Sequence, residues 1–368
     1  MKKIITMLII IFTLTGCLEK VELRDRAIVQ CFGIDFENDS YNITLQIFNS
    51  SVAQEGKSAD KNSLIVKTQG RTITEAVYNM NNLLGKTIFL GNNKVILIGR
   101  KTAENGIEDI LDFFDSDYQT RVKTTILICE DTAENTISAK EKEDIISSKD
   151  IFAVSEINKE HGIIGNSDIL TAETSFHSET CNSFLLGYLK VIKDNNKIYP
   201  NIIGSALFKD DKMIDIFEIA ESEGATWILG NPKLICISGE TTDSTKFSVT
   251  AKNIKSKISG EIKQDKIKIK ISVKFDGKTD EFDKGKKWEL TGAKMEEIEH
   301  ICNEKVREKI ELAVNKSIKN GCDTFNFDNY LSGKNINYVR KNSKNWSQII
   351  KQSKVDIEVK CVLERPII

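Results

Sequence analysis

The chain has 368 residues, of which 40% are hydrophobic, and its 52 basic and 54 acidic side chains give a formal net charge of −2. This balance of charge argues against a nucleic-acid-binding protein, and the hydrophobic content excludes an intrinsically disordered chain. The length is sufficient for two domains, each with a core of its own.

The N-terminus has the layout of a bacterial lipoprotein signal. Two lysines precede a largely apolar run at residues 4–14, and Leu14-Thr15-Gly16-Cys17 follows. The run is too short to span a membrane, which takes ~20 apolar residues, and no later run approaches that length. The last four residues match the lipobox, in which the chain is cut between Gly16 and Cys17 and the Cys17 thiol carries diacylglycerol. We therefore predict a signal peptide at residues 1–16 and a lipid anchor on Cys17. The alternatives are a plain signal peptide with an incidental cysteine and a buried N-terminal helix.

The other cysteines have no spacing typical of a metal or redox motif. Most of them stand among apolar residues, as in Ile235-Cys236-Ile237, which favours buried free thiols. One or more disulfides stay open as an alternative, because the chain is predicted to be exported. These seven residues are Cys31, Cys129, Cys181, Cys236, Cys302, Cys322 and Cys361.

An N-terminal α/β domain is expected at residues 17–197. Residues 27–35 and 41–48 predict a β-hairpin with one buried face, and Thr72-Ile73-Thr74-Glu75 predicts a helix start. Further strands and helices alternate up to residue 130. Residues 131–182 are mostly helical and charged, either as a helical layer of this domain or as a separate middle domain. The boundary is placed after the polar turn that begins at Asp194.

A C-terminal domain is expected at residues 198–368. Lysine and isoleucine alternate from Lys266 to Ile271, which predicts a strand with one buried face. A helix with an apolar stripe is predicted over residues 293–320, and a final strand over residues 355–363. The fold class is therefore α+β, with mixed or antiparallel sheets and packed helices. The C-terminal sheet is expected to be antiparallel and covered by the one long helix.

Several short motifs follow one another in the order typical of a known family. They are Gly33-Ile34-Asp35, Leu90-Gly91, residues 204–208 with Glu221, Gly224 and Trp227, Asp323-Thr324-Phe325, and Trp346. Behind the lipobox, this series resembles the C subunits of spore germination receptors, the Ger(x)C lipoprotein family, over essentially the whole chain. The sequence departs from the family pattern at Leu18, Asn92 and Ser116, where tryptophan, histidine and arginine are usual.

The resemblance implies a lipid-anchored, non-enzymatic subunit on the outer face of the spore inner membrane. It would act with integral-membrane A and B subunits in a receptor that starts germination when nutrients arrive, and it would be needed for assembly or signalling. Direct small-molecule binding is not expected, and no cofactor is implied.

No catalytic, cofactor-binding or metal-binding residue is predicted, because the three histidines are far apart and no nucleophile elbow or phosphate loop occurs. Trp227, Trp288 and Trp346 stand in polar surroundings. They are either anchors of a protein interface or residues that pack loops onto the sheets. The lysine-rich stretch from Lys246 to Lys274 either faces anionic lipid or forms a solvated sheet face.

Two other classes of protein compete with the receptor subunit. A solute-binding lipoprotein of a transporter would need two doubly wound lobes around a pocket. A cell-envelope hydrolase would need a nucleophile, base or metal set, which the sequence does not display.

Overall fold

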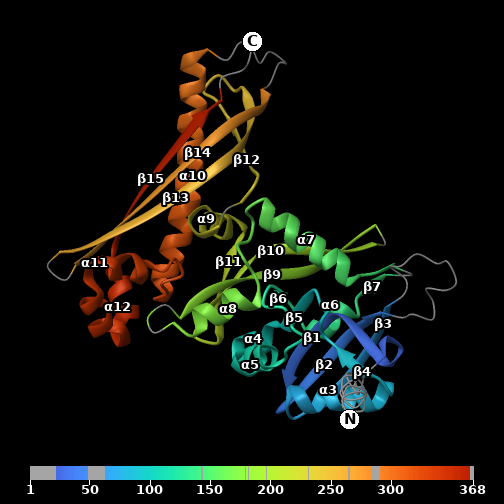
Figure 1. Ribbon diagram of the computed structural model, residues 1–368. Helices are drawn as coiled ribbons and strands as arrows, with labels where there is room; N and C mark the ends of the chain where they lie inside the picture. Colours follow the sequence, from blue (N-terminus) through green and yellow to red (C-terminus); the bar gives the residue numbers. More distant parts are fainter. Residues whose placement is uncertain are drawn as a thin grey trace, which may run out of the picture.

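The computed structural model describes residues 22–48, 63–141, 144–178, 180, 182–195, 197–230, 232–263, 266–282 and 291–364. They form two units, one around a nine-stranded sheet and one around a four-stranded sheet (Figure 1). The predicted signal peptide at residues 1–16, together with Cys17, Cys181 and Trp288, lies outside the described residues. Within the described residues, no helix has the length and apolar character needed to cross a bilayer.

The first unit is built on the nine-stranded sheet, in the order β11-β10-β9-β6-β5-β1-β2-β3 with β4 beside β1. The pairing of β1 with β2 confirms the predicted hairpin, and its turn has positive φ at Asn38 and Asp39. The strands are β1 (Arg26–Glu37), β2 (Ser40–Phe48), β3 (Ser63–Gly70), β4 (Thr87–Phe89), β5 (Val95–Gly99), β6 (Thr125–Cys129), β9 (Ser183–Asp194), β10 (Lys197–Lys209) and β11 (Lys212–Glu218).

Helices cover both faces of this sheet and close two apolar cores. Buried residues of α3, α5 and α8 pack on one face, and those of α6 and α7 pack on the other. Residues 131–182 therefore supply helical layers of the first unit. The elements are η1 (Leu23–Asp25), α3 (Ile73–Leu84), α4 (Arg100–Asn105), α5 (Glu108–Ser116), α6 (Ala133–Ile137), α7 (Ser148–Glu160) and α8 (Ile169–Phe176), with the small hairpin β7 (Lys140–Glu141) and β8 (Asp144–Ile145).

The expected domain boundary coincides with the turn between β9 and β10, where Lys197 pairs with Asp194. Strands β10 and β11 follow this turn and still belong to the nine-stranded sheet. The sheet of the first unit therefore continues to residue 218, and the second unit is built from the chain that follows.

The second unit is a four-stranded sheet in the order β12-β13-β14-β15, with helices packed on one face. As predicted, Ile267, Ile269 and Ile271 are buried while the lysines between them are exposed. The stripe of the long helix packs on the same core through Ile298, Cys302, Val306, Ile310 and Val314. The elements are α9 (Ile219–Leu229), β12 (Ile235–Glu240), β13 (Lys246–Lys263), β14 (Lys266–Phe282), α10 (Gly292–Asn320), α11 (Phe327–Asn342), η4 (Ser343–Asn345), α12 (Trp346–Lys351) and β15 (Lys354–Leu363).

The expectation of an antiparallel C-terminal sheet is correct for β12, β13 and β14 and wrong for β15, which pairs with β14 in parallel. The reason is the connection between the two strands. The chain leaves β14, returns along α10 and passes through α11 and α12 before it re-enters the sheet. A crossover of this length is the connection that parallel neighbours require.

Helix α9 packs against α10 at a glycine. A Cβ atom on Gly224 would lie 1.9 Å from the Lys309 carbonyl oxygen and 2.5 Å from its carbon, so the two backbones approach too closely for any side chain. Ion pairs flank this contact, from Glu223 to Lys309 and from Glu221 to Lys316. Residue 224 therefore sets the distance between the two helices.

Gly224→Ala is expected to lower the free energy of unfolding by about 2–3 kcal/mol, because the added methyl group forces α9 away from α10. Gly333→Ala in α11 is the matched control, since its Cβ would meet no atom within 4 Å. The control is expected to be neutral or stabilising by about 0.5–1 kcal/mol. Urea unfolding of the three proteins checks this, and equal stabilities of the two variants would contradict it.

Candidate functional site

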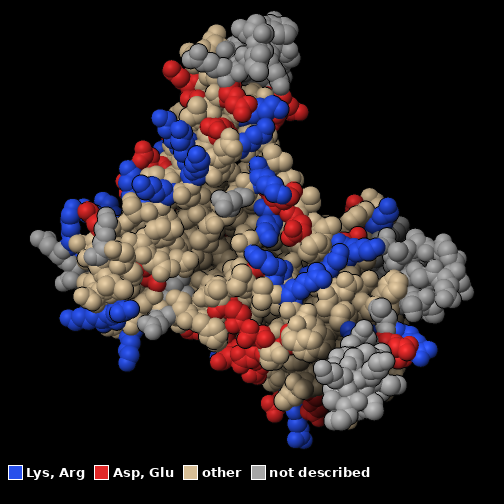
Figure 2. Space-filling view, viewed as in Figure 1, with Lys and Arg blue, Asp and Glu red and all other residues tan. Residues whose placement is uncertain are grey.

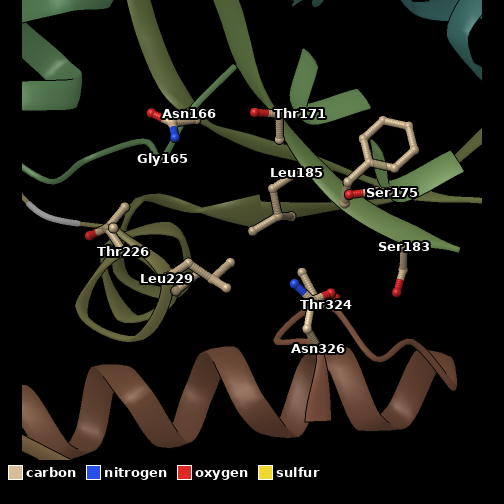
Figure 3. A pocket seen from close by; sticks show the side chains of 13 residues that line it. Gly165, Asn166, Thr171, Ser175, Ser183, Leu185, Thr226, Leu229, Thr324 and Asn326 are labelled. Carbon is tan, nitrogen blue, oxygen red and sulfur yellow. The ribbon is translucent and has the colours of Figure 1, made fainter. Parts of the chain in front are cut away.

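The junction of the two units contains a cavity of about 170 Å³ (Figure 3). Its walls come from the region of α8 and β9 on one side, and from α9 and the turn between α10 and α11 on the other. Its polar lining consists of neutral hydroxyl and amide groups, with Leu185 and Leu229 among the apolar residues. The polar residues are Asn166, Thr171, Ser175, Ser183, Thr226, Thr324 and Asn326.

Several hydroxyl groups of the cavity already take part in holding the fold. Thr226 donates to the Gly162 carbonyl at 2.6 Å, and Thr171 donates to the Asp168 carboxylate at 2.7 Å. Thr324 and Ser317 share a hydrogen bond of 2.8 Å. Since no ionisable side chain lines the cavity, it offers neither an acid–base pair nor a set of metal ligands. In the described part of the chain, no group of three or more metal-binding side chains occurs.

A buried carboxylate stands beside this junction, at the turn from α10 into α11. Asp323 accepts hydrogen bonds from the backbone N–H groups of Phe327 at 2.7 Å and Asp328 at 2.9 Å, and from the Trp346 indole at 2.8 Å. Burial, and then the neighbouring Asp328, raise the pKa of Asp323 to about 7. One side chain therefore ties together the start of α11, the start of α12 and the end of α10.

Polar contacts connect this turn to the first unit. The Thr180 hydroxyl, which precedes β9, donates to the Asp328 carboxylate. At the other edge, the Lys209 ammonium of β10 donates to the Ser347 hydroxyl of α12 at 2.7 Å. Asn320 at the end of α10 donates to Asp215 of β11 at 2.9 Å. The position of the C-terminal helices is thus linked to the last three strands of the nine-stranded sheet.

Two of the three predicted interface tryptophans are core residues. Trp227 is 0% exposed and its ring lies 5.0 Å from that of Phe275, whereas Trp346 is 2% exposed and bonded to Asp323. Burial rules out an exposed interface anchor at both positions. Each tryptophan packs into the core, but from the helices α9 and α12 rather than from a loop. In the sequence, the charged neighbours of Trp227 suggested an exposed position. In the structure, Glu221 and Glu223 form ion pairs with lysines of α10, and Trp227 beside them is buried.

Five cysteines are buried free thiols, as the sequence indicated: Cys31, Cys129, Cys302, Cys322 and Cys361. Cys236 is also free but exposed, against that expectation. The alternation of β12 explains the difference, since Ile235 and Ile237 point into the core and Cys236 points away from it. Among the described residues, no disulfide joins these thiols.

The comparisons with known proteins agree across both units. A profile described as spore germination protein N-terminal domain matches residues 19–191, and one described as spore germination B3/GerAC like, C-terminal, matches residues 203–366. The chain belongs to the Ger(x)C family.

Individual relatives support this assignment. Spore germination protein KC of Bacillus subtilis (strain 168) is 25% identical over 98% of this chain and 94% of its own length. The putative spore germination protein YfkR of the same organism is 25% identical over 63% of this chain and 62% of its own. The crystal structure of the GerBC protein has the same fold, with a TM-score of 0.57, 18% identity, and coverage of 90% of this chain and 96% of that one.

The junction contains residues that the sequence marked only through the family resemblance. Asp323 and Trp346 belong to Ger(x)C motifs, yet their shared hydrogen bond could not be inferred from their separation in the chain. Thr180 and Asp328 were missed altogether. The local signal was the polar residues Asp323, Thr324 and Asn326 just before α11, which are typical of a helix start.

The pH dependence of the free energy of unfolding tests the protonation state of Asp323. Its pKa rises from 3.8 to about 7 on folding, so the folded chain holds a proton that the unfolded chain releases. Stability from this group is therefore complete below the unfolded pKa and is lost as the pH rises through about 7. The Asp323→Asn variant lacks this dependence. The free energy of unfolding of the wild type, relative to that of Asp323→Asn, is expected to fall by about 2–3 kcal/mol between pH 5 and pH 8.

Urea unfolding of both proteins at the two pH values measures this difference. Asp112→Asn on the exposed face of α5 is a surface control, and its unfolding should follow the wild type at each pH. Parallel pH profiles for the wild type and Asp323→Asn would contradict the raised pKa.

Proposed function

We propose that this chain is a lipid-anchored, non-catalytic subunit of a nutrient germinant receptor. It would sit on the outer face of the spore inner membrane and act with integral-membrane A and B subunits to assemble the receptor or transmit its signal. The observation that carries the proposal is the whole-length match to a spore germination protein, in a chain with the lipobox Leu14-Thr15-Gly16-Cys17 near its N-terminus.

The anchor contributes through effective concentration. Two acyl chains on Cys17 hold a protein at a bilayer where a single chain binds only marginally. A protein confined to the membrane surface meets integral partners at high local concentration, so even a weak contact between subunits is occupied.

The solute-binding lipoprotein is less well supported by the architecture. Such a protein needs two doubly wound lobes that close around a solute. The second unit here is instead a four-stranded sheet with antiparallel β12, β13 and β14 and helices on one face. The cavity at the junction is small, and several of its hydroxyl groups are committed to the fold.

Affinity purification from detergent-solubilised spore membranes tests the proposal, with the rest of the operon intact. The wild type is expected to recover two multi-span partners. Cys17→Ala is expected to leave the membrane fraction, lose both partners and slow germination. Cys236→Ala, which removes an exposed cysteine of β12, is the matched control and should behave as the wild type.

Recovery of a transporter permease with its ATPase would overturn this function in favour of solute binding. The proposed function would also be overturned if the wild-type protein recovered no membrane partner and the Cys17→Ala strain germinated normally.

A further inference from the structure

Exposed apolar and basic side chains gather at the end of the first unit where β1 begins. Tyr118 is 92% exposed, Leu83 64% and Val122 53%, which are among the largest values for hydrophobic residues of the described chain. Lys86 and Arg121 are exposed as well, and neither forms an ion pair with a described residue. These five residues are called the anchor end below.

Strand pairing and side-chain contacts connect the anchor end to the first strand. Arg26 at the start of β1 pairs with Thr87, which follows Lys86 directly, and its guanidinium lies 4.7 Å from the ring centre of Phe89. The next residue, Leu90, donates its N–H to the Gln119 side chain at 3.1 Å. Gln119 is the neighbour of Tyr118 in the chain. The loop that holds Tyr118, Arg121 and Val122 therefore lies against the strand next to the start of β1.

The length of chain before β1 places this end near the membrane. This placement rests on the lipid anchor that the proposed function includes. Cys17 precedes Glu22, the first described residue, by five positions. An extended chain spans at most ~3.6 Å per residue, so the start of the fold can lie no more than about 18 Å from the lipidated thiol.

We propose that the anchor end is a second membrane contact, made by the protein itself, which lies against anionic lipid headgroups and fixes the orientation of the subunit. Tyrosine is suited to this position, because its ring enters the interface while its hydroxyl stays in water. Lysine and arginine next to it are attracted to anionic headgroups, and each raises the membrane-binding constant by about five-fold.

The exposed face of the C-terminal sheet is the competing membrane contact. Lys255, Lys274 and Lys360 lie directly opposite one another on β13, β14 and β15. No described acid forms an ion pair with these three side chains, and Figure 2 shows basic residues over this part of the molecule. However, the sheet extends from the first unit on the side opposite α3 and β4 (Figure 1). The short segment between Cys17 and Glu22 therefore holds the anchor end close to the bilayer. The three lysines of the C-terminal sheet lie on the far side of the molecule from it.

The test measures which end approaches the lipid. The full-length lipidated protein is placed in vesicles of phosphatidylglycerol and phosphatidylethanolamine, with a quencher on the acyl chains near the headgroups. An environment-sensitive fluorophore is attached to residue 118 in Tyr118→Cys/Cys236→Ser, and to the native Cys236 in the control protein. Both proteins carry Cys181→Ser. The five buried cysteines are shielded from the reagent, and the lipid occupies Cys17.

The label at residue 118 is expected to be quenched at least three-fold more than the label at Cys236. Lys86→Glu/Arg121→Glu should reduce the quenching at residue 118 by three-fold or more while the lipid keeps the chain on the vesicle. Lys255→Glu/Lys360→Glu reverses the same number of charges on the C-terminal sheet and should leave the quenching at residue 118 unchanged.

Three results would overturn the proposal in different ways. A lipidated, vesicle-bound chain with no quenching at residue 118 would overturn the contact alone and leave the anchor intact. Stronger quenching at Cys236 would assign the membrane contact to the C-terminal sheet. A Cys17 that carries no lipid by mass spectrometry would overturn the anchor and this contact together.

Discussion

The structure of the second unit depends on the burial of one carboxylate. Asp323 is removed from water at the turn after α10, where an isolated charge would be strongly unfavourable. Two backbone N–H groups at the start of α11 and the Trp346 indole supply the hydrogen bonds that water would otherwise make. Because these donors come from two helices, satisfying the carboxylate also positions both helices. Thr180 and Lys209 then connect this cluster to the nine-stranded sheet.

The first unit uses the same physical solution on a smaller scale. Asp35 lies at the buried end of β1 and accepts hydrogen bonds from the N–H groups of Ala133 and Glu134, each at 2.9 Å. These groups open α6, so the strand and a helix almost a hundred residues away are joined through one side chain. Burial raises the pKa of Asp35, although the two backbone bonds oppose the rise. A side chain on Gly99 would collide with this carboxylate, which explains a glycine at the end of β5.

The sequence predicted those parts of the fold that depend on local periodicity. Alternation from Lys266 to Ile271 requires one buried face whatever the partner strand is, and the structure has that face against α10. It could not predict features that depend on distant partners. Trp227 stands among acids, and only the fold reveals that these acids face lysines on α10 some ninety residues later. Likewise, the direction of β15 depends on the path of the long crossover rather than on the residues of the strand itself.

The family motifs have a physical meaning that bears on function. Asp35, Gly224, Asp323 and Trp346 all belong to the series that carries the resemblance, and each of them holds elements of the fold together. Motifs of this kind preserve a scaffold, and they do not mark the surface on which the scaffold acts. Contacts with lipid or with partner subunits must use exposed residues, which packing does not constrain. The first strand begins at Arg26, only nine residues after the predicted anchor. Its position is therefore more informative about orientation at the membrane than any of the shared motifs.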